Sequence, residues 1–298
     1  MTPDLLASPA SKLALAVVTA PERAPAPPTG AREDALRHLL GTAADAGVTK
    51  VATRPEGDGE RLLGQAWPFP SPFQVSVKTV SVSEGVDRVE ARARRSLERL
   101  GLPRGETLLV SSAQDLAGAD GRALWDRLQQ LKARGLFRKI GVCARLDDGP
   151  VPLARRFEPD VIQLPCNLLD QRAHRTGVIA ELAMQGVSVS LSSVFAGGAL
   201  FAGGETVSEA WSAHAHGLSR LRRRLAEARI DPMQATLAYT LGIAEASQVT
   251  ASVASAAELR AVLAAAHAPR PDLDWSSMAL ETAQVGAGAA PRLVSSAA

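Results

Sequence analysis

The chain has 298 residues, of which 46% are hydrophobic and 21% charged, so it can bury a large core and is neither disordered nor fibrous. Its 33 Lys and Arg residues nearly balance 31 Asp and Glu residues, which gives no reason to expect a nucleic acid or an acidic membrane as partner. Two cysteines in apolar runs, no apolar run of the ~20 residues that a membrane span needs, and no secretion-type N-terminus predict a soluble cytoplasmic protein.

Eight short apolar runs follow one another along the chain, and amphipathic stretches separate them. The runs begin at Leu13, Lys50, Gln74, Thr107, Lys139, Asp160, Val187 and Gln248. Their nearly continuous apolarity is typical of parallel strands that are covered on both faces. Between them, apolar residues recur every three or four positions, as in Val89, Ala93 and Leu97, which predicts helices that stop at glycines such as Gly101.

Eight alternating strand and helix units in roughly 250 residues predict an α/β protein with a (β/α)8 TIM barrel. An open, doubly wound sheet is the main alternative, but no G-x-G-x-x-G turn follows the first strand to support a Rossmann dinucleotide fold. We expect the barrel to span residues 12–281, after an N-terminal segment of residues 1–11 and before a flexible tail of residues 282–298.

The longest connection lies between the seventh and eighth predicted strands and holds two helical stretches, Ser208 to Ile230 and Asp231 to Leu241. The first contains Arg220, Arg222, Arg223 and Arg224. A solvated helix face is the simpler interpretation of this charge run, and a contact with an acidic partner is the alternative.

Two further segments differ from the alternating pattern. Residues 20–30 predict a proline-rich loop. The C-terminal segment is rich in Gly and Ala and ends in Ala297-Ala298, which resembles the small-residue tags that bacterial AAA+ proteases grip. A frayed end without function is the alternative interpretation of these two alanines.

Several segments match, in order, the motifs of one enzyme family. AADAGVTKVATRP and GERLLGQAW are similar to the family's A-x-x-x-G-I-x-x-x-D-T-A and s-E-x-x-L-G-x-x-L. VSVKTV, RSLERLGL, LQQLKARGLFRKIGVCA, DVIQLPCNLLDQR and QVTASVASAAELRAVLAA match later motifs, and VFAGGALFAG resembles the V-F-x-q-G-l-L of one branch. The chain therefore resembles an aldo-keto reductase over residues 12–280, and this resemblance implies the (β/α)8 barrel.

The resemblance also implies a catalytic tetrad, in which a lysine paired with an aspartate tunes a tyrosine acid and a histidine orients the substrate. Carried over to this chain, the aspartate falls on Ala52, the tyrosine near Gly57 and the lysine on Lys78. The histidine falls on Ser111 or Ser112. Only the lysine is retained, so we expect these degenerate positions to form no intact catalytic site.

Tyr239 is the one tyrosine of a chain that is only 4% aromatic, and it lies in MQATLAYTLGI, far from the position of the family's acid. We expect it to be a packing residue. Without the aspartate, Lys78 is an unpaired cation that either extends into solvent or holds a ribose or an anion.

Family members bind NAD(P)(H) at the carboxyl ends of the strands. By resemblance, the cofactor-binding positions of this chain are Thr53, Lys78, Gln163, Ser192, Ser193, Val194, Phe195 and Ser252. The resemblance implies that Gln163 binds the carboxamide and that Ser193 to Phe195 form the pyrophosphate loop. Ser192 replaces the residue that stacks on the nicotinamide, and Ala254 replaces an arginine near the 2′-phosphate, so NAD(H) is favoured over NADP(H).

We expect no metal site, because His214 and His216 lie two positions apart on a predicted helix and face different sides. Cys143 is expected to be a small core residue rather than a reactive thiol, since no histidine is placed beside it.

Loss of most of the tetrad favours a catalytically inactive homologue that acts as a regulator. Within the family, the chain resembles an oxidoreductase-like regulator of bacterial cell division. That resemblance implies NAD(H) binding, antagonism of the tubulin-like division GTPase FtsZ, control of a cell-fate histidine kinase, and turnover by a ClpXP-type protease through Ala297-Ala298. It also implies recruitment from the cytoplasm to the division site.

The alternative is an active NAD(P)H-dependent oxidoreductase, in which Lys78 works with Ser111, Ser112 or Thr53 as a proton relay.

Overall fold

The computed structural model describes residues 9–18, 29–201, 209–212 and 214–280. Eight parallel strands form a closed barrel in the order β1 to β8, and pairing of β1 with β8 closes it. The strands are β1 (Leu13–Val17), β2 (Lys50–Ala52), β3 (Gln74–Lys78), β4 (Gly105–Val110), β5 (Phe137–Cys143), β6 (Val161–Pro165), β7 (Ser188–Ser192) and β8 (Ala246–Val253). The predicted barrel is confirmed, and the eight apolar runs are its eight strands.

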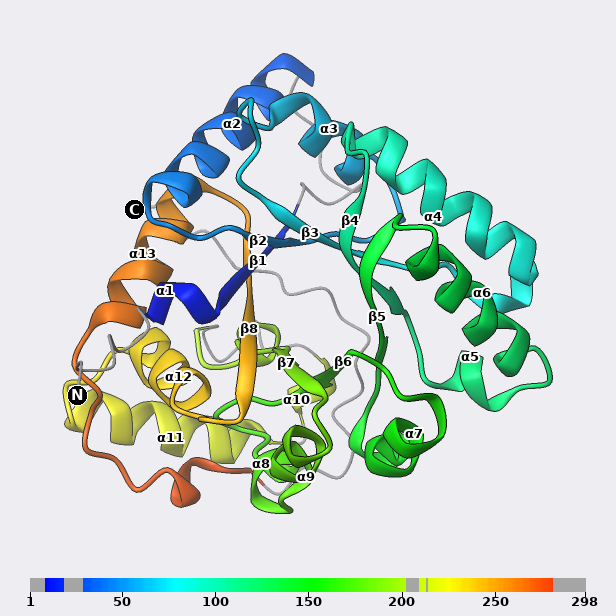
Figure 1. The fold of residues 1–298 in the computed structure, drawn as a ribbon. Helices are drawn as coiled ribbons and strands as arrows, with labels where there is room; N and C mark the ends of the chain where they lie inside the picture. Colours follow the sequence, from blue (N-terminus) through cyan, green and yellow to red (C-terminus); the bar gives the residue numbers. More distant parts are fainter. Residues whose placement is uncertain (1–8, 19–28, 202–208, 213, 281–298) are drawn as a thin grey trace, which may run out of the picture.

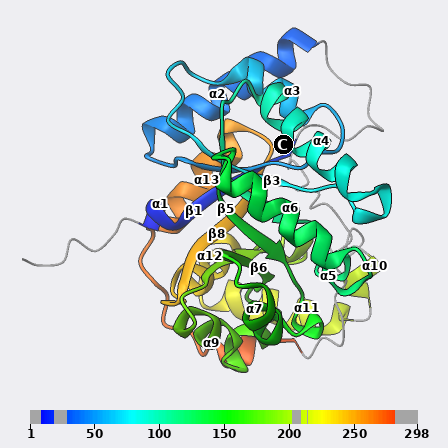
Figure 2. The same cartoon turned by 45° about the vertical axis from the view of Figure 1, so that its right-hand side comes forward.

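The helices lie outside the ring of strands (Figures 1 and 2). They are α1 (Pro9–Lys12), α2 (Thr29–Asp45), α3 (Gly59–Ala66), α4 (Val86–Leu100), α5 (Gln114–Ala117), α6 (Gly121–Ala133), α7 (Pro150–Phe157), α8 (Arg172–Arg175), α9 (Val178–Met184), α10 (Glu209–Ser212), α11 (Ala215–Glu227), α12 (Pro232–Leu241) and α13 (Ala256–His267). Short 3-10 turns are η1 (Val82–Glu84), η2 (Leu146–Asp148), η3 (Ala196–Gly198) and η4 (Ser276–Met278).

The apolar stripes of the helices pack against the strands. In α4 the buried stripe contains Val89, Ala93 and Leu97, as its spacing predicts. Burial of each large apolar side chain contributes about 2 kcal/mol relative to exposure. The helix ends at Gly101, whose left-handed conformation (φ 64°) suits glycine and lets its N–H bond to the last turn.

The connection between β7 and β8 differs from its prediction. The first predicted helical stretch contains two helices, α10 and α11, and His214 precedes α11 as an N-cap outside the helix. Likewise, Thr29 and Gly30 belong to α2 rather than to the proline-rich loop. Residues 19–28 and 281–298, with Ala297-Ala298, lie outside the described residues, and so does residue 213. Among the described helices, none is long and apolar enough to cross a membrane.

Close packing of neighbouring strands gives a first prediction. Gly141 lies in β5, where a Cβ atom would stand 2.2 Å from the carbonyl oxygen of Val161 in β6. Gly141→Ala should therefore lower the free energy of unfolding by about 3 kcal/mol in urea denaturation. Gly41→Ala is the matched control, because nothing lies within 4 Å of its Cβ position in α2. The control should gain about 1 kcal/mol from helix propensity. Equal stability of Gly141→Ala and the wild type would contradict the packing.

Candidate functional site

A cavity of about 780 Å³ lies at the carboxyl ends of the strands, and its size suits a small organic ligand or cofactor. Because the strands are parallel, residues far apart in the sequence meet at this rim. Of the predicted site positions, the lining includes Ala52, Thr53, Lys78, Ser111, Ser112, Gln163, Ser192, Ser193, Val194, Phe195 and Ser252. Gly57 does not line the cavity, although its neighbour Glu56 does.

Lys78 lies at the end of β3, half-buried in the cavity wall. It forms no hydrogen bond or ion pair with any residue that the structure describes. The neighbouring strand ends in Ala52, which pairs with Ser76 and has no carboxylate to offer. An amine in this setting can hold an anion, but it has no phenol to which it could couple.

The loop after β2 corresponds to the position of the family's tyrosine. A buried carboxylate and two partly buried arginines hold this loop in place. The Glu60 carboxylate of α3 is fully buried and lies 2.9 Å from Arg92 Nη2 of α4. The same Arg92 nitrogen donates to the Pro55 carbonyl, and Arg99 Nη2 donates to the Gly57 carbonyl at 2.6 Å. These bonds fix a loop that contains no ionisable group at the position of the expected proton donor.

The two serines after β4 do not replace the family's histidine. The Ser111 hydroxyl donates to the Thr79 carbonyl, and the Ser111 amide donates to Thr79 Oγ1 at 3.2 Å. Ser112 Oγ accepts from the Gln114 amide at 3.2 Å, so only its own hydrogen is available. A serine side chain is shorter than that of histidine, and its hydroxyl does not become a cation as an imidazole can.

Charge divides the cavity into two halves. All of its charged lining residues lie at the end of β3 or in the loops after β2 and β5, and they are Arg54, Glu56, Lys78, Arg145, Asp147 and Asp148. The lining residues after β6, β7 and β8 are uncharged. The sequence motifs did not indicate Arg54, Glu56, Arg145 or the two aspartates as lining residues. Arg54 lies in a matching motif at a position without an assigned role, and the others belong to loops without a family motif. Asp148 is held by Gln114 Nε2 at 2.6 Å and by the Arg145 amide at 2.7 Å.

On the uncharged half, Gln163 is buried, and its Oε1 accepts from the Cys143 thiol at 3.4 Å. The Gln163 amide nitrogen has no acceptor in the described part of the chain, so it can donate to a ligand. Cys143 is half-buried and lines the cavity. The prediction that Cys143 is a core residue is therefore wrong, because its side chain points from the strand end into the cavity.

The loop after β7 has an unusual backbone. Ser193 and Ala196 have positive φ angles of 55° and 50°, which non-glycine residues rarely adopt, and Gly197 and Gly198 follow with 66° and 81°. The amides of Ser193, Val194 and Phe195 have no acceptor among the described residues. Free amides in such a loop suit the oxygens of a phosphate group.

The turn after β8 holds a carboxylate close to its backbone. Ala254 offers no cation, and its amide donates to the Glu258 carboxylate at 2.7 Å. Ser255 caps α13 through the Glu258 amide. A carboxylate at this turn repels a further phosphate, whereas it can accept from a ribose hydroxyl. The free amide of Gln163 and the loop after β7 line the cavity and fit a nicotinamide dinucleotide, whereas Ser192 offers no ring for stacking.

Tyr239 lies in α12, away from the cavity, as predicted. It is buried beside Cys166, and its hydroxyl oxygen lies 3.1 Å from His174 Nδ1. Burial raises the pKa of the Tyr239 hydroxyl and that of the Cys166 thiol, the latter to about 12. Both groups therefore stay neutral at physiological pH and act in packing rather than in acid–base chemistry.

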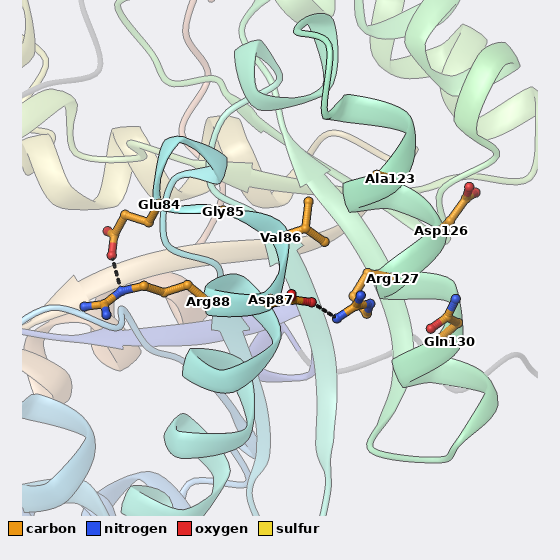
Figure 3. Close-up of a pocket in the computed structure, with 9 residues that line it drawn as sticks. All are labelled: Glu84, Gly85, Val86, Asp87, Arg88, Ala123, Asp126, Arg127 and Gln130. Carbon is orange, nitrogen blue, oxygen red and sulfur yellow. Dashed lines mark hydrogen bonds and ion pairs between the residues drawn. The ribbon is translucent and has the colours of Figure 1, made fainter.

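A second, more open hollow lies between the start of α4 and α6 (Figure 3). Its charges are already paired: Arg88 Nε lies 2.7 Å from Glu84, and Arg127 Nη1 lies 2.8 Å from Asp87. These charged groups are therefore already neutralised within the protein, so the hollow is a weak candidate for a ligand site. Within the described residues, no group of three or more His, Cys, Asp or Glu side chains is placed to hold a metal ion.

The buried thiol predicts a pH dependence. The unfolded Cys166 ionises near the ordinary value of 9.0, whereas the folded thiol stays protonated up to about 12. The free energy of unfolding should therefore fall as pH rises through this window, since the unfolded state loses the proton first. Cys166→Ser should make the fall shallower in urea denaturation. Cys143→Ser is the control, and a fall that is identical in all three proteins would contradict this interpretation.

Comparison with known proteins agrees with the fold. The sequence model of the aldo/keto reductase family matches residues 33–279. Among solved structures, an aldose reductase of Giardia lamblia is similar with 14% identity and a TM-score of 0.66, over 90% of this chain and 91% of that chain. An aldo-keto reductase of Bacillus halodurans in its holo form is similar with 16% identity and a TM-score of 0.64, over 81% of this chain and 85% of that chain.

A Pseudomonas aeruginosa protein assigned to the aldo-keto reductases is similar with 21% identity and a TM-score of 0.63, over 86% of this chain and 89% of that chain. At these identities the likeness concerns the fold. A search of curated proteins found no match. The match to the family over most of the chain, together with the closed barrel and its rim cavity, shows that this chain belongs to the aldo/keto reductase family.

Proposed function

We propose that the protein is an NAD(H)-responsive regulator that has lost carbonyl reductase activity. The observation that carries this proposal is the contrast between the two halves of the cavity. The half after β6 to β8 retains polar groups that suit a dinucleotide, whereas the half after β2 to β4 retains only Lys78 of the four catalytic positions.

The chemistry of reduction explains why this loss matters. A bound nicotinamide would supply a hydride, but a carbonyl oxygen also needs a proton from a positioned acid. In this chain no tyrosine stands at the loop after β2, the Ser111 hydroxyl is engaged with Thr79, and Lys78 has no carboxylate partner. A lone ammonium binds the oxygen of an anion well but is a poor proton donor at neutral pH.

The preferred dinucleotide is NAD(H). The Ala254 and Glu258 turn offers a carboxylate and no adjacent cation, so the additional phosphate of NADP(H) would be poorly compensated there. The free amides after β7 would bind the pyrophosphate, and the Gln163 amide nitrogen would donate to the carboxamide.

The alternative is an active oxidoreductase with a rearranged site. The remaining hydroxyl hydrogen of Ser112 favours it, because Ser112 lines the same cavity as Lys78 and could relay a proton. Thr53 is less suited, since its hydroxyl donates to the Ser76 carbonyl at 3.3 Å. This alternative requires consumption of NADH or NADPH with simple aldehydes.

The regulatory role that we propose is in bacterial cell division. Sequence resemblance to KidO, an oxidoreductase-like division regulator, supports it. The proposed partners are the GTPase FtsZ, a cell-fate histidine kinase, and a ClpXP-type protease that would engage Ala297-Ala298. The protein would act in the cytoplasm and be recruited to the division site.

The cofactor part of the proposal makes a direct prediction. NADH should bind the purified protein in a fluorescence titration, and NADPH should bind more weakly. Gln163→Leu should weaken NADH binding roughly tenfold, because a buried hydrogen bond to the carboxamide is lost. Gln130→Leu, an exposed position on α6, is the matched control. A panel of aldehydes and ketones should consume no NADH. Absence of NADH binding would overturn the proposal, and steady turnover would establish the alternative.

The division part is tested separately by sedimentation of FtsZ polymers in the presence of GTP. The protein should lower the pelleted fraction of FtsZ, and NADH should change the size of this effect. Gln163→Leu should lose the NADH response while it keeps the effect of the unliganded protein. If neither the wild type nor the variant changes the pellet, FtsZ is not a partner, whatever the outcome of the NADH titration.

A further inference from the structure

Helix α11 has an arginine cluster without acidic partners. Its four arginines are Arg220, Arg222, Arg223 and Arg224, and none forms an ion pair with a residue that the structure describes. Helix α4 offers a contrast, because all five of its arginines are ion-paired: Arg88, Arg92, Arg94, Arg95 and Arg99. The charges on α4 are paired on the barrel's own surface, whereas no described carboxylate pairs with those on α11.

The fold leaves one side of α11 open. Leu218, Leu221 and Leu225 are buried against the barrel. A Cβ atom on Gly217 would stand 2.7 Å from Leu280, so the chain's last described segment covers a second side. Arg224 Nη1 bonds to this segment, at 3.4 Å from the Ser277 carbonyl.

Arg220 and Arg223 lie on the remaining, open side. Both are exposed, and they stand three residues apart, which places them next to each other on a helix. Two like charges in this arrangement repel each other, and a carboxylate between them would relieve the repulsion. Guanidinium groups bind carboxylates with two parallel hydrogen bonds, which favours an acidic protein segment as the ligand.

Arg222 points the other way and connects this helix to the cavity. It is half-buried, and its Nη2 donates to the carbonyl of Ala199. Its Nε is buried without a partner among the described residues. Ala199 directly follows the strained loop after β7, and the rings of Phe195 and Phe201 in the same segment pack with centroids 5.7 Å apart.

We propose that Arg220 and Arg223 on α11 form the docking surface for an acidic segment of a protein partner, and that Arg222 couples this surface to NAD(H) in the cavity. The coupling rests on the proposed function, since it requires a dinucleotide at the loop after β7. Any movement of that loop on ligand binding would be passed to α11 through the bond between Arg222 and Ala199. The docking surface itself does not depend on the cofactor.

The test is fluorescence anisotropy with a short labelled peptide of alternating Glu and Ala, at low salt, with and without NADH. The double variant Arg220→Glu/Arg223→Glu should weaken peptide binding by about tenfold or more, because attraction becomes repulsion. The double variant Arg88→Glu/Arg95→Glu on α4 changes the net charge by the same amount and is the matched control. It should bind the peptide as the wild type does.

The coupling is tested in the same assay. NADH should change the peptide affinity of the wild type by about fivefold, and the peptide should change NADH affinity by the same factor. Arg222→Gln should abolish this mutual effect, and Arg222→Lys, which keeps a donor, should retain part of it.

Each result decides one part of the proposal. Equal losses in the α11 and α4 variants, or no loss in either, would overturn the docking surface. Tighter binding of a short single-stranded DNA than of the peptide would overturn the choice of an acidic protein segment. If NADH does not bind at all, the proposed function fails, but the peptide assay without NADH still tests the surface. If NADH binds and leaves peptide affinity unchanged, the coupling through Arg222 is wrong.

Discussion

Closure of the parallel sheet between β1 and β8 is the constraint on which the site depends. Because the chain returns to the same rim after each helix, side chains from Thr53 to Ser252 line one cavity. The barrel is held by its strands and by apolar helix stripes, none of which requires the residues at the rim. Substitutions at the rim can therefore remove chemistry while the fold persists.

The absence of a carboxylate at Ala52 shows this separation in physical terms. A cation at the end of a strand loses attraction when its partner is removed, but Lys78 is only half-buried and water can reach it. The cost to the fold is therefore small. On the opposite half of the cavity, free amides and neutral side chains depend on backbone geometry, which the barrel preserves.

Much of this arrangement could be predicted from the sequence, because strand positions follow from periodicity and rim positions follow from strand ends. Lys78 and Gln163 were assigned through the family resemblance, which places them on two of these strands. The loops were harder to predict. Glu56 reaches the cavity from a loop that long-range contacts hold, namely the bonds of Arg92 and Arg99 to the loop after β2. No local pattern encodes such contacts.

Two further residues show the same limit. Cys143 stands in an apolar run and was expected in the core, yet the end of β5 directs it to the cavity. The role of Arg222 depends on the Ala199 carbonyl, which is 23 positions away in the sequence. A charge run by itself does not distinguish an arginine that faces solvent from one that supports a loop.

Binding of NAD(H) without transfer of its hydride would distinguish a regulator from a reductase. The most direct measurement is mass spectrometry of the alcohol formed from an aldehyde that is incubated with the protein and with NADH deuterated at the transferable position. We expect bound NADH and no deuterium in the alcohol above the level of a reaction without protein. Deuterium incorporation that grows with protein concentration, and that Lys78→Met abolishes, would contradict it.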